Sequence, residues 1–112
     1  VIVTNGGGAG VLAADEAERR GLPLAALSPE TVARLDAVLP ASWSRGNPVD
    51  ILGDADGARY RAALAVLAER PGPATLLAMN CPTGVADGVD CARAVRDAAD
   101  GRPLIACWLG EE

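Results

Sequence analysis

The chain has 112 residues, half of them hydrophobic, which is enough for one domain with a buried core and too few for two. It has no histidine and its ten basic residues are all arginines, so this chain alone cannot run histidine-dependent nucleophilic catalysis, histidine-ligated metal chemistry or lysine Schiff-base chemistry. A formal net charge of -5 argues against a nucleic-acid or anionic-membrane surface, because such surfaces need clustered positive charge. No apolar stretch approaches the roughly 20 residues of a membrane span.

The first predicted elements enclose a glycine-rich turn. Residues 1–4 form a short β-branched run that predicts a strand, and residues 5–10 form the glycine-rich turn. Residues 11–20 are rich in Ala, Glu and Arg, with acids early and arginines late, which predicts a helix. A second short strand is expected over residues 22–27.

The second predicted helix has a well-defined start. Ser28 offers a capping hydroxyl, Pro29 occupies the first helical position, and Glu30 places an acid in the first turn. Pro40 ends this helix, because proline cannot continue the hydrogen-bond ladder. Residues 41–47 read as a loop.

The middle of the chain predicts a strand, a helix and another strand. A short strand is expected over residues 49–52, followed by a helix that Asp54 or Asp56 caps. Residues 71–73, Pro-Gly-Pro, end that helix. Residues 74–79 are an uninterrupted apolar run, which is typical of a strand buried on both faces of a parallel sheet.

The last part of the chain predicts a turn, a helix and a strand. The turn covers residues 80–84, and the strand covers residues 104–109. The helix between them is expected to direct four apolar residues inward: Val85, Val89, Ala92 and Val95.

Strands that alternate with helices at this spacing predict one α/β domain over residues 1–112. The expected architecture is a doubly wound parallel sheet of about five strands in a flavodoxin-like three-layer sandwich. The sequence begins without Met inside a strand-like run, so we expect a fragment of a longer multidomain protein.

Ligands of open parallel sheets bind beyond the carboxyl ends of the strands. Two turns expected there combine Asn with Gly ahead of a helix, and free N–H groups at a helix start suit phosphate or carboxylate. The glycine patch does not complete GxGxxG, because Val11 stands at the third glycine position. The candidate substrate- or phosphate-binding residues are Asn5, Gly6, Gly7, Gly8, Thr83, Gly84 and Val85. No catalytic or metal-binding residue is expected in this chain.

The acidic candidates have ordinary structural explanations. Asp50 is a possible general base, or its carboxylate accepts from a backbone N–H or from Arg45. Asp87 and Asp90 are typical acids of a helix start.

The tryptophans and thiols also favour packing roles. Trp108 is expected in the core, and Trp43 is a packing lid or an interface anchor. The sequence has three cysteines and no CxxC pair, which is typical of reduced thiols in a cytoplasmic protein. Cys81 and Cys107 lie in apolar runs and are expected to be small core residues.

Three motifs together resemble a known family. They are Thr-Asn-Gly-Gly-Gly-Ala-Gly-Val at residues 4–11, Leu-Ser-Pro-Glu-Thr at residues 27–31, and Gly-Asn-Pro-Val-Asp-Ile-Leu-Gly-Asp-Ala at residues 46–55. In this order they resemble the ligase-CoA domain, the second flavodoxin-like domain, of NDP-forming acyl-CoA synthetases. That group includes ADP-forming acetyl-CoA synthetases and is related to succinyl-CoA synthetase.

The resemblance implies that the whole protein converts acyl-CoA, ADP and phosphate to acid, CoA and ATP. The reaction of that family passes through an acyl phosphate and a phosphorylated histidine on another domain. By the same resemblance, Asn5 and its glycines match the turn that contacts substrate. Residues 83–86 match the turn that opens a helix facing the phosphoryl group.

The resemblance also implies the cofactors and partners. The whole protein would use CoA, ADP or ATP, and Mg²⁺, while this domain alone would bind no cofactor and would be inactive. Its partners would be a CoA-binding domain, a sister flavodoxin-like domain and an ATP-grasp pair, and its ligand an acyl phosphate, phosphate or carboxylate. Neither nucleic acid nor membrane is an expected partner.

Residues 80–87 differ from the Thr-Pro-Gln type of turn and look closer to relatives fused to a GNAT protein-lysine acetyltransferase module. The alternative function is therefore a ligand-sensing regulatory domain. A further alternative is a scaffold that only packs against its sister domain. A flavin carrier is disfavoured, because it would need a Ser/Thr-rich phosphate loop and more aromatic side chains than Trp43, Trp108 and Tyr60.

Overall fold

The computed structural model describes residues 1–70 and 75–110. Within these residues one parallel sheet has four strands in the order β2-β1-β3-β4. The strands are β1 (Ile2–Thr4), β2 (Val49–Asp50), β3 (Leu76–Asn80) and β4 (Leu104–Trp108). Strand β1 lies between β2 and β3, so the chain builds the sheet outward from β1 in both directions. This is the doubly wound arrangement that the sequence predicts.

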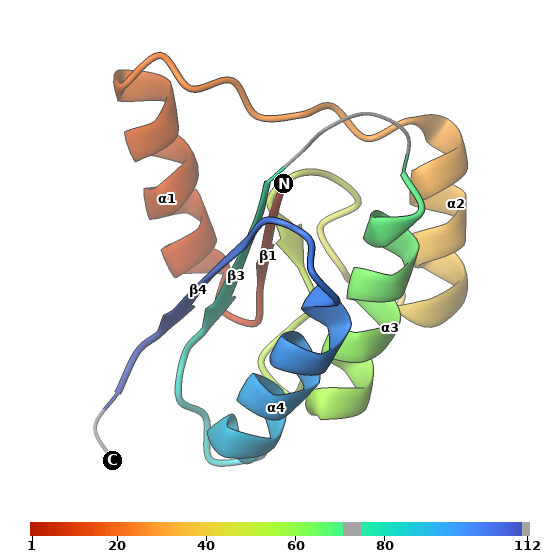
Figure 1. Cartoon of the computed structure of the whole chain (residues 1–112), viewed down its shortest axis with the longest axis vertical. Helices are drawn as coiled ribbons and strands as arrows, with labels where there is room; N and C mark the ends of the chain where they lie inside the picture. Colours follow the sequence, from red (N-terminus) through yellow and green to blue (C-terminus); the bar gives the residue numbers. More distant parts are fainter. Residues whose placement is uncertain (71–74, 111–112) are drawn as a thin grey trace.

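Helices cover both faces of this sheet (Figure 1). The helices are α1 (Gly7–Arg19), α2 (Pro29–Val38), α3 (Gly57–Ala68) and α4 (Gly88–Ala99). Helix α1 packs on β1 and β2 on one face, while α2, α3 and α4 pack in a row on the other. The prediction of a flavodoxin-like three-layer α/β sandwich is therefore confirmed. Over the two described stretches no helix combines the length and apolarity that a membrane crossing requires.

Two helix starts follow the predicted capping chemistry. The Ser28 side-chain oxygen accepts from the Thr31 N–H at 3.1 Å, and Pro29 is the first residue of α2. Of the two aspartates proposed to cap the third helix, Asp56 does so, accepting from the Arg59 N–H at 2.9 Å. These caps satisfy N–H groups that have no acceptor within the helix.

The expected strand over residues 22–27 is wrong, so the sheet has four strands among the described residues instead of about five. These residues connect α1 on one face to α2 on the other (Figure 1). Leu22 and Leu24 are exposed and no strand pairs with them. Pro23 also lacks the N–H that a sheet ladder needs. The apolar residues of this segment therefore do not indicate a strand.

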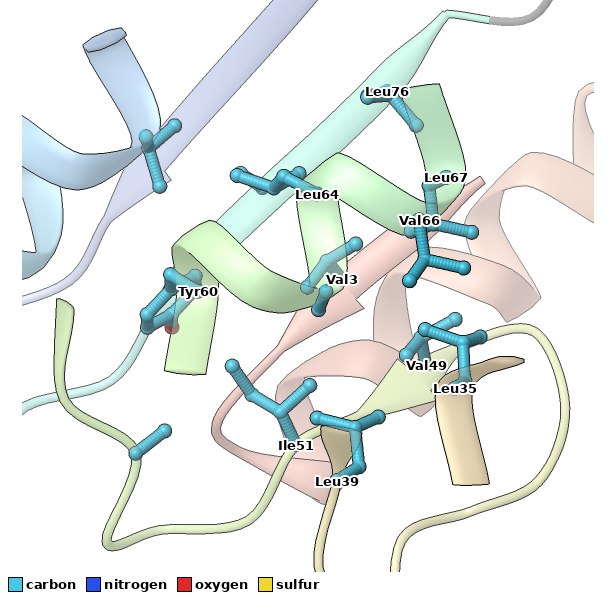
Figure 2. Packing of buried hydrophobic residues seen from close by; sticks show 14 of the residues in the cluster. Val3, Leu35, Leu39, Val49, Ile51, Tyr60, Leu64, Val66, Leu67 and Leu76 are labelled. Carbon is cyan, nitrogen blue, oxygen red and sulfur yellow. The ribbon is translucent and has the colours of Figure 1, made fainter. Parts of the chain in front are cut away.

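The main core lies between the sheet and the layer formed by α2, α3 and α4. Figure 2 shows its largest side chains converging from these helices and from strands β1, β2 and β3. Trp43 is also buried there, and its Nε1–H donates to Asp36 Oδ1 at 2.8 Å. Of the two roles predicted for Trp43, the structure therefore supports packing and not an interface anchor.

Helices α1 and α4 differ from their predicted forms. Helix α1 begins at Gly7 instead of residue 11, so most of the glycine-rich turn is helical. Helix α4 begins at Gly88, which leaves Val85 outside it and exposed. Val89 is also largely exposed, whereas Cys91, Ala94 and Val95 form the buried face. The predicted inward face of this helix is therefore correct at Val95, correct in part at the half-buried Ala92, and wrong at Val85 and Val89. The Pro-Gly-Pro stop at residues 71–73, and Ala74, lie outside the described residues.

Candidate functional site

The turns that follow β1 and β3 lie side by side at the carboxyl edge of the sheet. Asn5 joins them, because its Nδ2 donates to the Cys81 carbonyl at 2.9 Å and its Oδ1 accepts from the Cys81 N–H at 2.7 Å. Asn5 is 4% exposed. The structure therefore brings the two candidate turns together, and the amide of Asn5 is committed to holding them in place.

The start of α1 presents free main-chain N–H groups. Gly6 stands at the N-cap with an extended backbone and no side chain to accept from them, and the first turn contains no acid. Gly7 and Gly8 are exposed, and a Cβ built on Gly8 would meet nothing within 4 Å. Because the first N–H groups of a helix have no internal acceptor, this end carries partial positive charge open to a ligand.

Two contacts bring other elements close to this helix start. A Cβ on Gly6 would lie 2.6 Å from Cys81 Sγ, so only glycine allows the turn after β3 to approach so closely. A Cβ on Gly7 would lie 2.9 Å from Asp50 Oδ2. The open approach to the helix start is therefore at Gly8.

The turn after β3 differs from what the sequence predicts. Val85 is 74% exposed, and its N–H lies 3.4 Å from Thr83 Oγ1, which accepts it weakly. Gly84 is exposed, with nothing near a Cβ built on it. Asp87 caps α4 by accepting from the Val89 N–H at 2.9 Å, and Asp90 adds a second acid in the first turn. The start of α4 thus already carries carboxylates, as expected for Asp87 and Asp90.

A hollow of about 400 Å³ lies between the turn after β3, the start of α4 and the end of β4. We call it the α4 hollow. Its lining includes the buried Asn80, the half-buried Trp108 and Thr83, and the exposed Pro82 and Asp87. Trp108 is half-buried, packs at 6.2 Å between ring centroids against Tyr60, and donates its Nε1–H to the Gly88 carbonyl at 2.9 Å. Trp108 is half-buried and packs against the core, so its prediction as a core residue is correct only in part, and it also lines the hollow.

Sequence reasoning missed Asn80 and Tyr60 as a pair. The Tyr60 hydroxyl donates to the Met79 carbonyl at 2.7 Å, and Asn80 Nδ2 donates to the Tyr60 oxygen at 3.2 Å. Burial raises the pKa of Tyr60 above its ordinary value, so the hydroxyl keeps its proton. The available signal was an Asn that closes the otherwise apolar run of β3.

The remaining candidates have structural partners. Asp50 Oδ1 accepts from the Leu52 N–H at 2.9 Å, as its structural explanation predicts, while Arg45 pairs with Asp36. Burial raises the pKa of the Cys91 thiol, and a hydrogen bond from Arg59 lowers the pKa of Asp54. Cys81 and Cys107 are half-buried free thiols, so their prediction as core residues is wrong. In the described part of the chain, no three Asp, Glu, Cys or His residues gather as a metal site.

Comparison with known proteins identifies the family. Residues 1–100 match the family model described as the Ligase-CoA domain. The chain belongs to the Ligase-CoA domain family. This Ligase-CoA domain is 39% identical over 111 residues to the ADP-forming acetate–CoA ligase I of Archaeoglobus fulgidus, covering 99% of this chain and 16% of that protein. It is 36% identical over 116 residues to the alpha subunit of ADP-forming acetate–CoA ligase II of Pyrococcus furiosus, covering 96% of this chain and 25% of that subunit.

Solved structures give the same result for the fold. The dinucleotide-forming acetyl-coenzyme A synthetase 1 of Ca. Korarchaeum cryptofilum superposes in its apo form with a TM-score of 0.90 at 26% identity, over 99% of this chain and 25% of that one. Its complex with phosphate and ADP superposes with a TM-score of 0.89 at 26% identity, with the same coverage. The Ligase-CoA domain therefore spans about a quarter or less of these relatives.

Proposed function

We propose that this Ligase-CoA domain serves an ADP-forming acyl-CoA synthetase by lending main-chain N–H groups to a phosphate or carboxylate. The observation that carries the proposal is the uncapped start of α1, where Gly7 and Gly8 are exposed at the carboxyl edge of the sheet. An uncapped helix start is a ready-made anion site. The relatives are named as ADP-forming ligases, and one related structure is described as a complex with phosphate and ADP.

The neighbouring turn would complete the site. Thr83 contributes a hydroxyl, and the Gly84 N–H, which has no acceptor among the residues described, is free to donate to the same anion. Val85 extends this exposed turn toward a partner. Asn5 and Gly6 act by holding the two turns together, through the bonds to Cys81 and the close approach of its sulfur.

Such a half-site acts by electrostatics instead of proton transfer. Fixed N–H dipoles stabilise charge on a phosphoryl or acyl-phosphate group without having to reorganise during the reaction. This fits a chain without histidine or lysine. In the proposed synthetase, acyl-CoA, ADP and phosphate are converted to acid, CoA and ATP through an acyl phosphate and a phosphorylated histidine on another domain.

The other components are assigned to other domains of the whole protein. The described residues offer no cluster suited to Mg²⁺, so the proposal places Mg²⁺, CoA and ADP or ATP on the CoA-binding, sister flavodoxin-like and ATP-grasp domains. The protein would act in the cytoplasm. The comparisons give no support to the regulatory alternative, a GNAT-fused acetyltransferase.

The test is an assay of the whole polypeptide that contains this domain. With a panel of acyl-CoA substrates, ADP and phosphate, it should form ATP and free CoA. A Gly84→Leu variant should lose most of this activity while still binding CoA, because the added side chain crowds the turn without touching the fold. Ala65→Leu, on the exposed face of α3, is the control for added bulk. Failure of the whole polypeptide on every acyl-CoA would contradict the proposal.

A further inference from the structure

Asp50 places a carboxylate beside the start of α1. Strand β2 pairs with β1 in parallel register, so Asp50 lies next to Thr4, three positions before Gly7. A Cβ built on Gly7 would lie 2.9 Å from Asp50 Oδ2. Because a carbon–carbon bond is about 1.5 Å long, Oδ2 lies within about 4.4 Å of the Gly7 Cα. An anion bound to the N–H groups of this helix start would therefore be a neighbour of Asp50.

One oxygen of the half-buried Asp50 is held in place, and the other has no donor. Oδ1 accepts from the Leu52 N–H at 2.9 Å, which fixes the side chain with Oδ2 toward α1. Among the residues that the structure describes, none donates a hydrogen bond to Oδ2. The two arginines closest to Asp50 in the sequence, Arg45 and Arg59, pair with other aspartates. Oδ2 is therefore an acceptor that remains available beside the helix start.

N–H donors beside a carboxylate oxygen discriminate between anions. The N–H groups at the start of α1 donate to any anionic oxygen. A fully deprotonated anion, such as sulfate or a carboxylate, would also bring negative oxygens against Oδ2 of Asp50, and like charges at close range repel. Hydrogen phosphate offers the same acceptors and one O–H, which Oδ2 can accept as a charge-assisted hydrogen bond. The same carboxylate thus repels one kind of anion and binds the other.

We propose that Asp50 is a specificity-determining residue of the α1 anion site, and that its Oδ2 accepts a hydrogen bond from the O–H of a bound hydrogen phosphate. This role rests on the proposed function, because it takes the anion to bind at the start of α1. It narrows the ligand of that site from a phosphate or a carboxylate to an anion that carries a proton. Asp50 thereby selects inorganic phosphate against the carboxylate of the acid product at this position.

The test compares phosphate with sulfate in mildly alkaline buffer without divalent cations. Hydrogen phosphate and sulfate then have the same charge and the same tetrahedral shape, and only hydrogen phosphate has an O–H. Each anion is titrated into the isotope-labelled chain. The backbone N–H signal of Gly8 is the readout, and that of Gly21, beyond the other end of α1, is the internal control. Phosphate should bind at least about tenfold more tightly than sulfate, as one hydrogen bond to a charged group requires.

Asp50→Asn provides the matching change in the protein. Its amide oxygen can still accept from the Leu52 N–H, so an NH₂ donor replaces Oδ2 beside α1. This variant should bind sulfate more tightly than the original chain does and lose the preference for phosphate. Asp15→Asn removes one negative charge from the exposed surface of α1, about two turns beyond Gly8, and should keep the preference.

The outcomes separate the role of Asp50 from the anion site itself. Equal affinity of the original chain for both anions, or a preference for phosphate that survives in Asp50→Asn, would overturn the role of Asp50 and leave the proposed function standing. The lack of a saturable Gly8 shift with either anion would overturn the site and the role of Asp50 together. If Asp50→Asn does not fold, the comparison of the two anions on the original chain still decides.

Discussion

Replacing Gly10 with alanine tests whether α1 sits as close to the sheet as the structure shows. Gly10 is the buried residue of α1, and a Cβ there would lie 2.8 Å from Thr4 Cγ2 and 3.3 Å from Pro48 Cβ. Overpacking of this kind costs about 1–3 kcal/mol. The alanine also improves helix propensity by about 1 kcal/mol, so the net loss of unfolding free energy is about 0–2 kcal/mol.

Gly8→Ala is the matched control on the same helix. A Cβ at Gly8 meets nothing within 4 Å, so only the gain in helix propensity remains, up to about 1 kcal/mol. Urea unfolding followed by tryptophan fluorescence measures both variants. With a slope of about 1–3 kcal/mol per molar urea, their midpoints should differ by about 1 M, with Gly10→Ala the lower. If Gly10→Ala is stabilised as much as Gly8→Ala, the close packing of α1 on β1 is refuted.

Further predictions concern Asn5 and Tyr60. Asn5→Ala leaves the Cys81 carbonyl and N–H without their partners, so it should reduce the unfolding free energy by about 2–4 kcal/mol in the same urea experiment. A loss below about 1 kcal/mol would show that Asn5 does not hold the two turns together. Because burial raises the pKa of Tyr60, the folded state holds its proton longer than the unfolded state, so stability is complete below about pH 10 and falls as the pH rises further. Tyr60 is the sole tyrosine of the sequence, so a pH titration followed by phenolate absorbance reports its ionisation directly. If Tyr60 ionises in the folded chain at the pH typical of a free tyrosine, this account is contradicted.

Local chemistry explains which elements the sequence predicts well. The starts at Ser28 and Asp56 depend on side chains only three residues from the N–H groups they accept, so they are visible in the sequence. The parallel strands also follow from their apolar runs. Residues 22–27 look similar in composition, but only the tertiary structure shows that they cross between the two helix layers without a pairing partner.

The site depended more strongly on contacts between distant residues. The meeting of the two turns was predicted, because parallel strands bring their carboxyl ends to one edge of the sheet. The commitment of Asn5 to Cys81, however, spans 76 positions of sequence and cannot be read from either turn alone. Asp87 caps α4, so the helix starts at Gly88 and leaves Val85 outside it. The buried face of α4 is formed by Cys91, Ala94 and Val95, and Val89 does not lie on it. The pairing of Asn80 with Tyr60 likewise depends on residues that lie 20 positions apart in the sequence.

Phosphate binding to Gly8 variants tests most directly whether main-chain N–H groups form the anion site. Gly8→Ala keeps the N–H, whereas Gly8→Pro removes it at a first-turn position where proline is tolerated. In a phosphate titration of the chain, Gly8→Ala should bind as the original does, and Gly8→Pro about tenfold more weakly, as expected for one hydrogen bond to a charged group. Equal affinity in all three proteins would contradict the account.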